Sequence, residues 1–429
     1  MRGVAVGMVG LMLGVLAWAI SLESFSAPVP APTEGAQSGS DHLVCPLADF
    51  VRSETEVSLK AARPGPIPLW NVREGEWSPL GGADLDDWGM WTGAAPAGNS
   101  ALLAESGAGP SGAGLTNTAP EAISAWTCGE SSDRLGALGG ATLADDRLDL
   151  VLYNPYVLDS VVQVVIASEL GEDTPPALRE IYVPAGKTVE ITLDEPLRLR
   201  RSLAVLAESS PGRIALLLRQ TGKGETAMTE GVAPHTDWWL PVPDLGQAET
   251  YLIIAAPSGS PFTYRVDLMT ESGPLPEFLE EDFLPGQLVS IPLSSLPGGV
   301  TGIGVVGTVP LVAGLRLEGE GLLAIGPGVR ETSKSWFLPA VGDGSGRDNR
   351  AWLLNPSGLE ARVSVSAGGF SLTVTVPPES VRSFDLGKLR GSSPGRPGYL
   401  VEAQEEIAVV TTTQLQGGAA SVAVGAPVG

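Results

Sequence analysis

Histidine and cysteine are scarce in this chain, whose 429 residues contain only 2 of each. So few imidazoles and thiols leave little material for zinc sites or for histidine-based acid–base catalysis. Basic residues are also outnumbered: 26 Lys and Arg face 49 Asp and Glu, which gives a formal net charge of −23. Because this charge repels a phosphate backbone, we expect no nucleic-acid partner.

The sequence also lacks the common motifs of catalytic nucleophiles and bases. The sequence has no Ser-x-x-Lys pair, and His42 and His235 are its only imidazole bases. His42 lies beside a Pro- and Ser-rich stretch, and His235 lies near the start of an expected strand, where a histidine is typically incidental. We therefore expect a protein that is not an enzyme and that carries no cofactor.

The chain instead repeats one pattern, a hydrophobic strand that ends in a proline step. Copies lie at residues 149–155, 251–257 and 351–356, which are about 100 residues apart. Short runs of Val, Leu, Thr and Ala alternate with turns that use many of the 55 Gly and 36 Pro. About seven such strands per repeat match the rhythm of an immunoglobulin-like sandwich. We predict an all-β protein of tandem immunoglobulin-like β-sandwich units with independent cores; a β-propeller is the alternative.

The repeats divide the chain into units. Residues 135–222, 235–320 and 335–429 are predicted β-sandwiches, and residues 43–134 a degenerate β unit. The intervening stretches, including residues 221–234 with their Gly, Thr and acidic side chains, are predicted linkers.

A predicted targeting segment precedes these units. Positive charge at Arg2 is followed by an apolar run at residues 4–20, whose length is intermediate between a cleavable signal peptide and a membrane-spanning anchor. We favour the anchor for residues 1–26, followed by a flexible Pro- and Ser-rich stalk at residues 27–42. The expected location is the cell envelope, with the C-terminal part outside the membrane; secretion is the alternative.

Two cysteines, Cys45 and Cys128, fit an exported protein. In an oxidising compartment such a pair is more often a disulfide than two thiols. Only His42 lies near Cys45, and Cys128 has no His or Cys neighbour at zinc-site spacing, so a metal site is the weaker alternative.

The candidate binding residues lie in a Trp-rich segment of the first unit, residues 64–98, which matches nothing in the other units and is predicted to be an insertion. Aromatic faces interleaved with carboxylates suit a carbohydrate platform, but we favour local packing as their role, with a protein contact as a further alternative. These residues are Trp70, Trp77, Trp88, Trp91, Asp84, Asp86 and Asp87. Acidic clusters at residues 84–87, 145–149, 280–282 and 343–348 could in principle ligate calcium, but solvated loop carboxylates are the default and we expect no metal.

A family resemblance is carried by the runs WTC at residues 126–128, LGG at 138–140, LVLYNP at 150–155 and VPAG at 183–186. In these runs the chain resembles a family of exported actinobacterial proteins of unknown function. The units separately are similar to the Trp-strand and Asn-Pro sandwich repeats of bacterial surface proteins, although the third unit has Ala256 in place of Asn. The resemblance implies an envelope location and supplies no catalytic residues.

Together these features predict a non-catalytic envelope scaffold or interaction protein displayed outside the membrane. Its partner would be an envelope protein or a cell-wall glycan, and the N-terminal segment would contact the membrane. A cell-wall glycan-binding module is one alternative. An accessory subunit of an envelope glycosyltransferase, or an enzyme, is another.

Overall fold

The computed structural model describes residues 42–46, 54–61, 66–73, 76–85, 89–94, 100–105, 111–118, 123–129, 131–222, 225–246, 248–256, 261–284, 286–339, 347–389, 398–416 and 418–428. The predicted signal or anchor segment, and the predicted stalk up to residue 41, lie outside these ranges. Within them, no helix has the length and apolar character needed to cross a bilayer.

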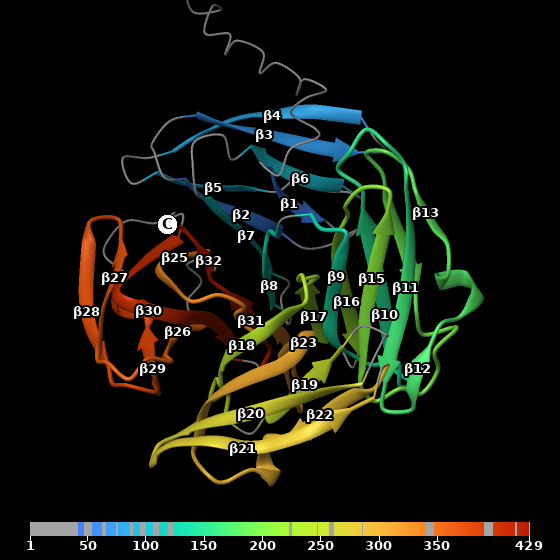
Figure 1. Ribbon diagram of the computed structural model, residues 1–429. Helices are drawn as coiled ribbons and strands as arrows, with labels where there is room; N and C mark the ends of the chain where they lie inside the picture. Colours follow the sequence, from blue (N-terminus) through green and yellow to red (C-terminus); the bar gives the residue numbers. More distant parts are fainter. Residues whose placement is uncertain are drawn as a thin grey trace, which may run out of the picture.

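The all-β prediction is confirmed, because the described chain consists of strands joined by turns and short 3-10 helices (Figure 1). The first unit contains β1 (His42–Pro46), β2 (Glu54–Ala61), β3 (Pro66–Arg73), β4 (Glu76–Asp84), β5 (Met90–Ala94), β6 (Ser100–Glu105), β7 (Ser111–Thr118) and β8 (Ile123–Thr127). The second contains β9 (Arg134–Gly140), β10 (Asp146–Tyr153), β11 (Ser160–Ser168), β12 (Gly171–Asp173), η2 (Pro176–Leu178), β13 (Ile181–Val183), β14 (Thr188–Thr192), β15 (Leu203–Ser210), β16 (Ala215–Gly222) and β17 (Glu225–Glu230).

Two further units complete the chain. The third contains β18 (His235–Pro241), β19 (Glu249–Ala255), β20 (Phe262–Thr270), β21 (Gly273–Phe283), β22 (Leu288–Pro292), η3 (Leu293–Ser295), β23 (Val300–Gly319) and β24 (Leu322–Pro327). The fourth contains β25 (Ser333–Pro339), β26 (Arg347–Asn355), β27 (Ala361–Ala367), β28 (Phe370–Val376), β29 (Ser380–Asp385), η4 (Leu386–Leu389), β30 (Gly398–Leu415), β31 (Ala420–Val424) and β32 (Ala426–Pro427).

All units share one topology, in which two antiparallel sheets form a sandwich. In the first unit the sheets have the orders β8-β7-β2-β5 and β1-β6-β3-β4; in the second they are β17-β16-β10-β14 and β9-β15-β11-β12. In the third and fourth units one long strand, β23 or β30, crosses from one sheet to the other and replaces two strands. The alternation predicted for one strand is confirmed: Val363 and Val365 of β27 are buried, and the serines between them are half-buried.

The two Asn-Pro steps occupy equivalent places in their sandwiches, whereas Pro257 of the third step lies outside the described residues. Asn154 directly follows β10 and Asn355 is the last residue of the equivalent strand β26, and both are buried. Asn154 Nδ2 donates to the carbonyl of Leu158 at 2.8 Å, as Asn355 Nδ2 donates to that of Leu359. Each Asn Oδ1 accepts the backbone amide two residues later. The asparagine therefore fastens the loop that follows the strand.

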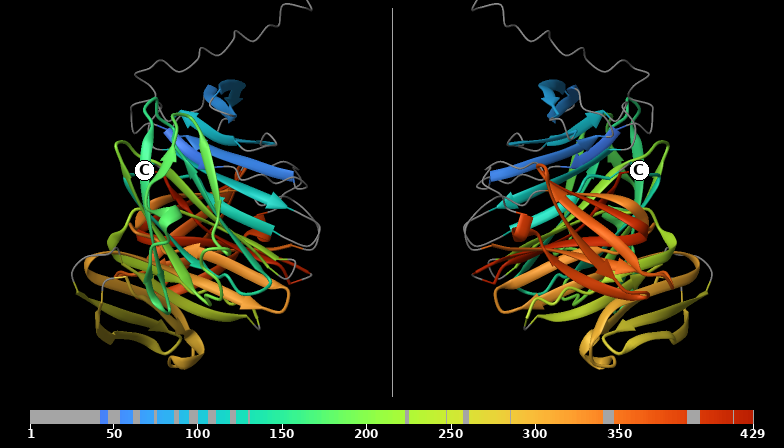
Figure 2. Two further views of the ribbon diagram at one scale, coloured as in Figure 1. Left: turned by 90° about the vertical axis from the view of Figure 1, so that its right-hand side faces the viewer. Right: turned by 90° about the vertical axis from the view of Figure 1, so that its left-hand side faces the viewer.

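The units are arranged in a closed ring rather than in the row that tandem modules suggest. Figure 1 shows them around a common axis, with the first unit blue, the second green, the third yellow and the fourth orange to red. The fourth unit contacts the first through β31 and β8, and through β25 and β7. Side views show the paired sheets of the units (Figure 2). The ring is not a β-propeller, since each unit is a two-sheet sandwich and a propeller blade is a single sheet.

The prediction of independent cores is borne out in part: the second sandwich has a buried apolar cluster made only of its own residues, including Leu150, Val164 and Leu216, but other clusters cross between units. One buried apolar cluster runs through the third and fourth units and includes Leu138 and Leu206 of the second, while another joins the first and second. Met90, Phe337 and Ala426 close the junction between the first and fourth units. The shared clusters were not predicted, because the prediction followed the strand alternation within a unit, which says nothing about apolar residues on the outer faces of neighbouring units.

Two further predictions are corrected. The Trp-rich segment is not an insertion without regular structure, because it forms β3, β4 and β5, which pair in the same order as the equivalent strands elsewhere. The predicted linker at residues 221–234 contains β17, and β24 begins just beyond the predicted end of the third unit. Each unit therefore has about eight strands rather than seven.

Candidate functional site

The ring axis is built from the last strand of each sandwich. These axial strands are β8, β17, β24 and β31, and each packs against the next around the axis. Small side chains occupy one equivalent position in all of them: Ser124, Ala227, Ala324 and Ser421. Ser124 Oγ also donates to the carbonyl of Thr226 at 2.7 Å, which ties β8 to the neighbouring β17. The small residues let the strands approach closely and close this part of the axis.

Beyond the axial strands the chain turns from one sheet of its sandwich to the other. The residue at this turn donates its amide to the preceding strand in every unit: Cys128 to Ala113 at 3.0 Å, Gly231 to Leu216 at 2.8 Å, Gly328 to Ala313 at 2.8 Å and Gly425 to Val409 at 3.0 Å. Glycine is needed where neighbours crowd the backbone. A Cβ on Gly231 would lie 2.7 Å from Leu216 Cβ.

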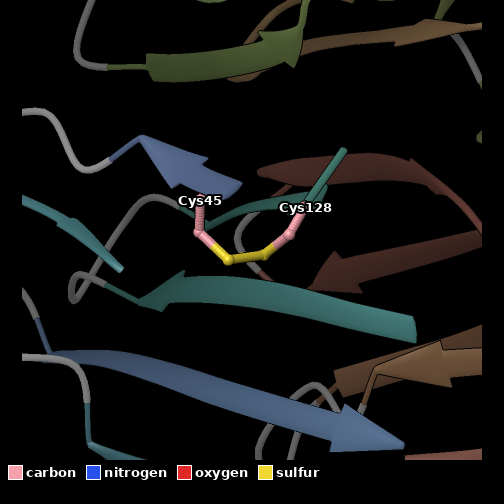
Figure 3. Close-up of a disulfide and its surroundings, with 2 residues drawn as sticks. All are labelled: Cys45 and Cys128. Atoms are coloured by element: carbon pink, nitrogen blue, oxygen red, sulfur yellow. A yellow bond between two sulfur atoms is a disulfide. The ribbon is translucent and has the colours of Figure 1, made fainter. Parts of the chain in front are cut away.

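The predicted disulfide is confirmed, and it lies at this turn. Cys128 takes the glycine position in the first unit and bonds to Cys45 of β1, with a Cα–Cα distance of 4.6 Å (Figure 3). The link joins the two sheets of the first sandwich beside the axis. In the chain-entropy account, closing a loop over a sequence separation of 83 stabilises the fold by about 4 to 5 kcal/mol.

A cavity of about 450 Å³ opens where the axial strands end. Segments that follow β8, β17, β24 and β31 all line it, so every unit contributes to one site. Its wall is mixed: Leu43, Val232 and Val424 are apolar and half-buried, while Asp133, Arg213, Arg330 and Glu331 are charged and exposed. This volume lies in the range of small-ligand pockets, and pockets at interfaces between domains are a common location for binding sites.

Glu230 is the buried charged residue of this cavity. Glu230 is the last residue of β17, and only 8% of its surface is exposed to solvent. Burial raises the pKa of its carboxyl group to about 7, although a hydrogen bond from the backbone amide of Thr127 partly opposes this. None of the ion pairs among the described residues involves Glu230.

The sequence-predicted binding residues do not gather into one exposed platform in the part described. Trp70 of β3 is 1% exposed and belongs to the interior, so it presents no face to a sugar ring. Trp91 of β5 is half-buried and packs on the first unit's core. Trp77 and Asp84 lie in β4, while Trp88, Asp86 and Asp87 lie outside the described residues.

The acidic clusters have structural roles where they can be placed. Asp149 is fully buried, and its carboxylate accepts hydrogen bonds from Arg147, Arg219 and Thr192. Burial by itself would raise the pKa of Asp149, but these bonds outweigh it and lower the pKa. In the described ranges, no group of three or more His, Cys, Asp or Glu residues is arranged to hold a metal ion.

The His235 side chain makes a local hydrogen bond, in which its Nδ1 accepts the backbone amide of Asp237 at 3.2 Å. The tryptophan nearby is structural: Trp238 Nε1 donates to the carbonyls of His235 and Leu311, as Trp336 Nε1 donates to those of Ser333 and Ile407. These matched bonds anchor the first strand of the third and fourth sandwiches to the bend of the long strand.

Sequence reasoning missed Glu230 because it assigned this stretch to a linker. Comparison of the repeats could have identified it. The residues before the turn are Thr127, Glu230, Pro327 and Val424, so only the second unit has a charge at this position. A charge at one copy of a repeat position that is uncharged in the others marks a departure from scaffold packing.

Comparisons with solved structures give weak likenesses only. A mutant of the major pilin from Streptococcus pyogenes shows 6% identity over 90% of this chain and 99% of that chain, with a TM-score of 0.15. A mutant Salmonella alpha-2-macroglobulin shows 12% identity over 91% of this chain and 30% of that one, with a TM-score of 0.11. A tetra-tandem repeat from the extending region of a large adhesion protein shows 9% identity over 89% and 97%, with a TM-score of 0.10. Scores this low carry no argument about fold or function.

The family comparison is more informative. No curated protein matches the chain. The model of a family of unknown function, DUF5719, matches residues 92–322, from β5 to the start of β24. This range covers more than half of the sequence and contains the whole second unit with its Glu230. The chain belongs to the family of unknown function DUF5719.

Proposed function

We propose that this protein is a non-catalytic interaction protein of the cell envelope, displayed outside the membrane, and that the axial cavity is its binding site. The observation that carries the proposal is that segments from all units converge on this one cavity. A ring closed by a shared core holds such a site rigidly, which lowers the entropic cost of binding.

Export is supported by the disulfide of the first unit and by the N-terminal segment that precedes this unit. The disulfide between Cys45 and Cys128 suits an oxidising compartment. The apolar run at residues 4–20, preceded by Arg2, suits a signal peptide or an anchor. We propose the anchored form, with the ring outside and the membrane contacted only through the N-terminal segment.

The non-catalytic part of the proposal rests on what lines the cavity. Among its described lining residues, Glu230 is the single deeply buried titratable side chain, whereas acid–base or nucleophilic catalysis generally uses converging groups. The partner we favour is an envelope protein, because the site combines an apolar wall with a charged rim, as protein interfaces do.

Site-specific photo-crosslinking on intact cells tests this function. A photoreactive amino acid at position 330, on the cavity rim, is expected to capture a partner, while the same group at the exposed position 372 of β28 serves as the control. Protein adducts from position 330 alone support an envelope-protein partner, and polysaccharide adducts support the glycan alternative. Equal capture from both positions, or no surface labelling of the protein by an impermeant reagent, contradicts the proposal.

A further inference from the structure

Glu230 is a charged group without a charged partner at the centre of the ring. Glu230 is 8% exposed. Hydrogen bonds from backbone amides, including that of Thr127, partly offset the effect of burial on the pKa of its carboxyl group. The buried Asp149 of the same unit shows the contrast. Its carboxylate lies 2.6 Å from Arg219 Nη2 and 2.9 Å from Arg147 Nε, so its charge is balanced within the fold.

Other charges around the cavity do not neutralise Glu230. Asp133, Arg213, Arg330 and Glu331 line the mouth, and all are exposed to solvent. Their formal charges cancel, so the ionised site retains the single negative charge of Glu230. A carboxylate removed from water without a cation is costly, and a bound cation that reaches it recovers part of that cost.

The wall near this carboxylate favours an organic cation over a bare ion. The half-buried Leu43, Val232 and Val424 supply apolar surface, and the described lining has no second buried carboxylate to complete a metal shell. The cavity volume of about 450 Å³ admits a short chain together with its charged head.

We propose that the axial cavity binds a primary ammonium group carried on a short aliphatic stem, such as a lysine side chain, with the ammonium paired to the carboxylate of Glu230. The inference rests on the proposed function in taking this cavity as the binding site. An ammonium supplies three N–H donors, and its stem packs on the apolar wall.

This pairing predicts proton release. At neutral pH the empty site holds a proton for part of the time, because the pKa of Glu230 is raised to about 7. A primary amine stays protonated up to about pH 10, so the ammonium competes with that proton. Affinity is therefore expected to rise by roughly 30-fold between about pH 5.5 and about pH 8, and then to level off.

Calorimetric titration of the purified full-length protein with n-butylammonium tests the proposal, with n-butanol and butyrate as matched neutral and anionic probes. We expect binding of the ammonium alone. Glu230→Gln should weaken it by at least about tenfold at pH 8 and remove the pH dependence. Glu280→Gln, the same change on the exposed strand β21, should leave affinity and pH dependence unchanged. Circular dichroism verifies that each variant is folded.

The inference is overturned if Glu230→Gln binds the ammonium as the unaltered protein does, or if butanol binds equally well. Those results, together with persistent crosslinks from position 330, would reject the ligand class and leave the binding role standing. Failure of both experiments would reject the proposed function itself.

Discussion

Cys128 lies at the same place in the first sandwich as Gly425 in the fourth: each donates its amide at 3.0 Å to the preceding strand, at the turn where the chain leaves the axis. The cysteine bonds to Cys45, whereas the glycine faces Leu338, whose Cδ2 would lie 2.9 Å from a Cβ on Gly425. The disulfide therefore replaces a glycine–leucine contact at one copy of a repeated position.

This equivalence predicts a second, engineered disulfide. In the double variant Leu338→Cys and Gly425→Cys the two sulfurs should bond on oxidation, because the strands approach as they do at Cys45 and Cys128. Alkylation followed by intact mass measurement should find no free thiol in the double variant and one in Leu338→Cys alone. Two alkylated thiols after oxidation would contradict the equivalence. Trp336 Cε3 lies 3.0 Å from the new Cβ position, so a small shift of its ring is expected.

Glu230 should make the protein less stable as pH rises. Its pKa is about 7 in the folded state and near the ordinary 4.5 in the unfolded chain, so the folded state holds the extra proton between these values. The contribution of Glu230 to stability is greatest below about pH 4.5 and falls by about 3 kcal/mol as pH rises to about 7 and above. Glu230→Gln should flatten this dependence in urea unfolding measured from pH 5 to 8. An unchanged slope in the variant would assign the pH effect elsewhere.

Asp149 should act with the opposite sign. Its folded-state pKa is lowered, so the stabilisation it gives is present above its ordinary value near 3.8 and is lost as pH falls below that. Asp149→Asn removes the charge that Arg219 and Arg147 need and should cost about 3 kcal/mol at pH 7 in denaturant unfolding. The exposed pair of Arg134 and Glu208 provides the control. Glu208→Gln should change stability by less than about 1 kcal/mol, and an equal loss in both variants would refute the role given to Asp149.

Asn355 should be needed for the loop that follows β26. Its side chain is buried and bonds to the carbonyls of Leu359 and Pro377 and to the amide of Ser357. Asn355→Ala leaves those groups unpaired and is expected to cost about 2 to 4 kcal/mol. Asn154→Ala should cost a similar amount, because the same bonds recur there. A loss below about 0.5 kcal/mol at both sites, measured by urea unfolding, would show that the asparagines are dispensable.

The prediction of the candidate site was much poorer than that of the fold. Trp70 and Trp91 attracted attention because aromatic clusters suit both cores and binding surfaces, and composition cannot separate the two. The structure buries the first and half-buries the second. Glu230 was missed because its segment drew no attention. The sequence of β17, Glu-Thr-Ala-Met-Thr-Glu, shows no strand alternation. Its strand is held by neighbours from other units, which local sequence does not reveal.

The sequence by itself determined most of the strands, their grouping into similar sandwiches, the recurrence of the Asn-Pro step and the pairing of Cys45 with Cys128. Alternation, turn residues and repeat spacing are local properties, and only one cysteine pair was available. The tertiary structure alone decided that the sandwiches close into a ring, share buried apolar clusters across their junctions and enclose Glu230 at the axis. Contacts between units join residues hundreds of positions apart, such as Thr127 and Val424, whose hydrogen bond no pattern within a single repeat records.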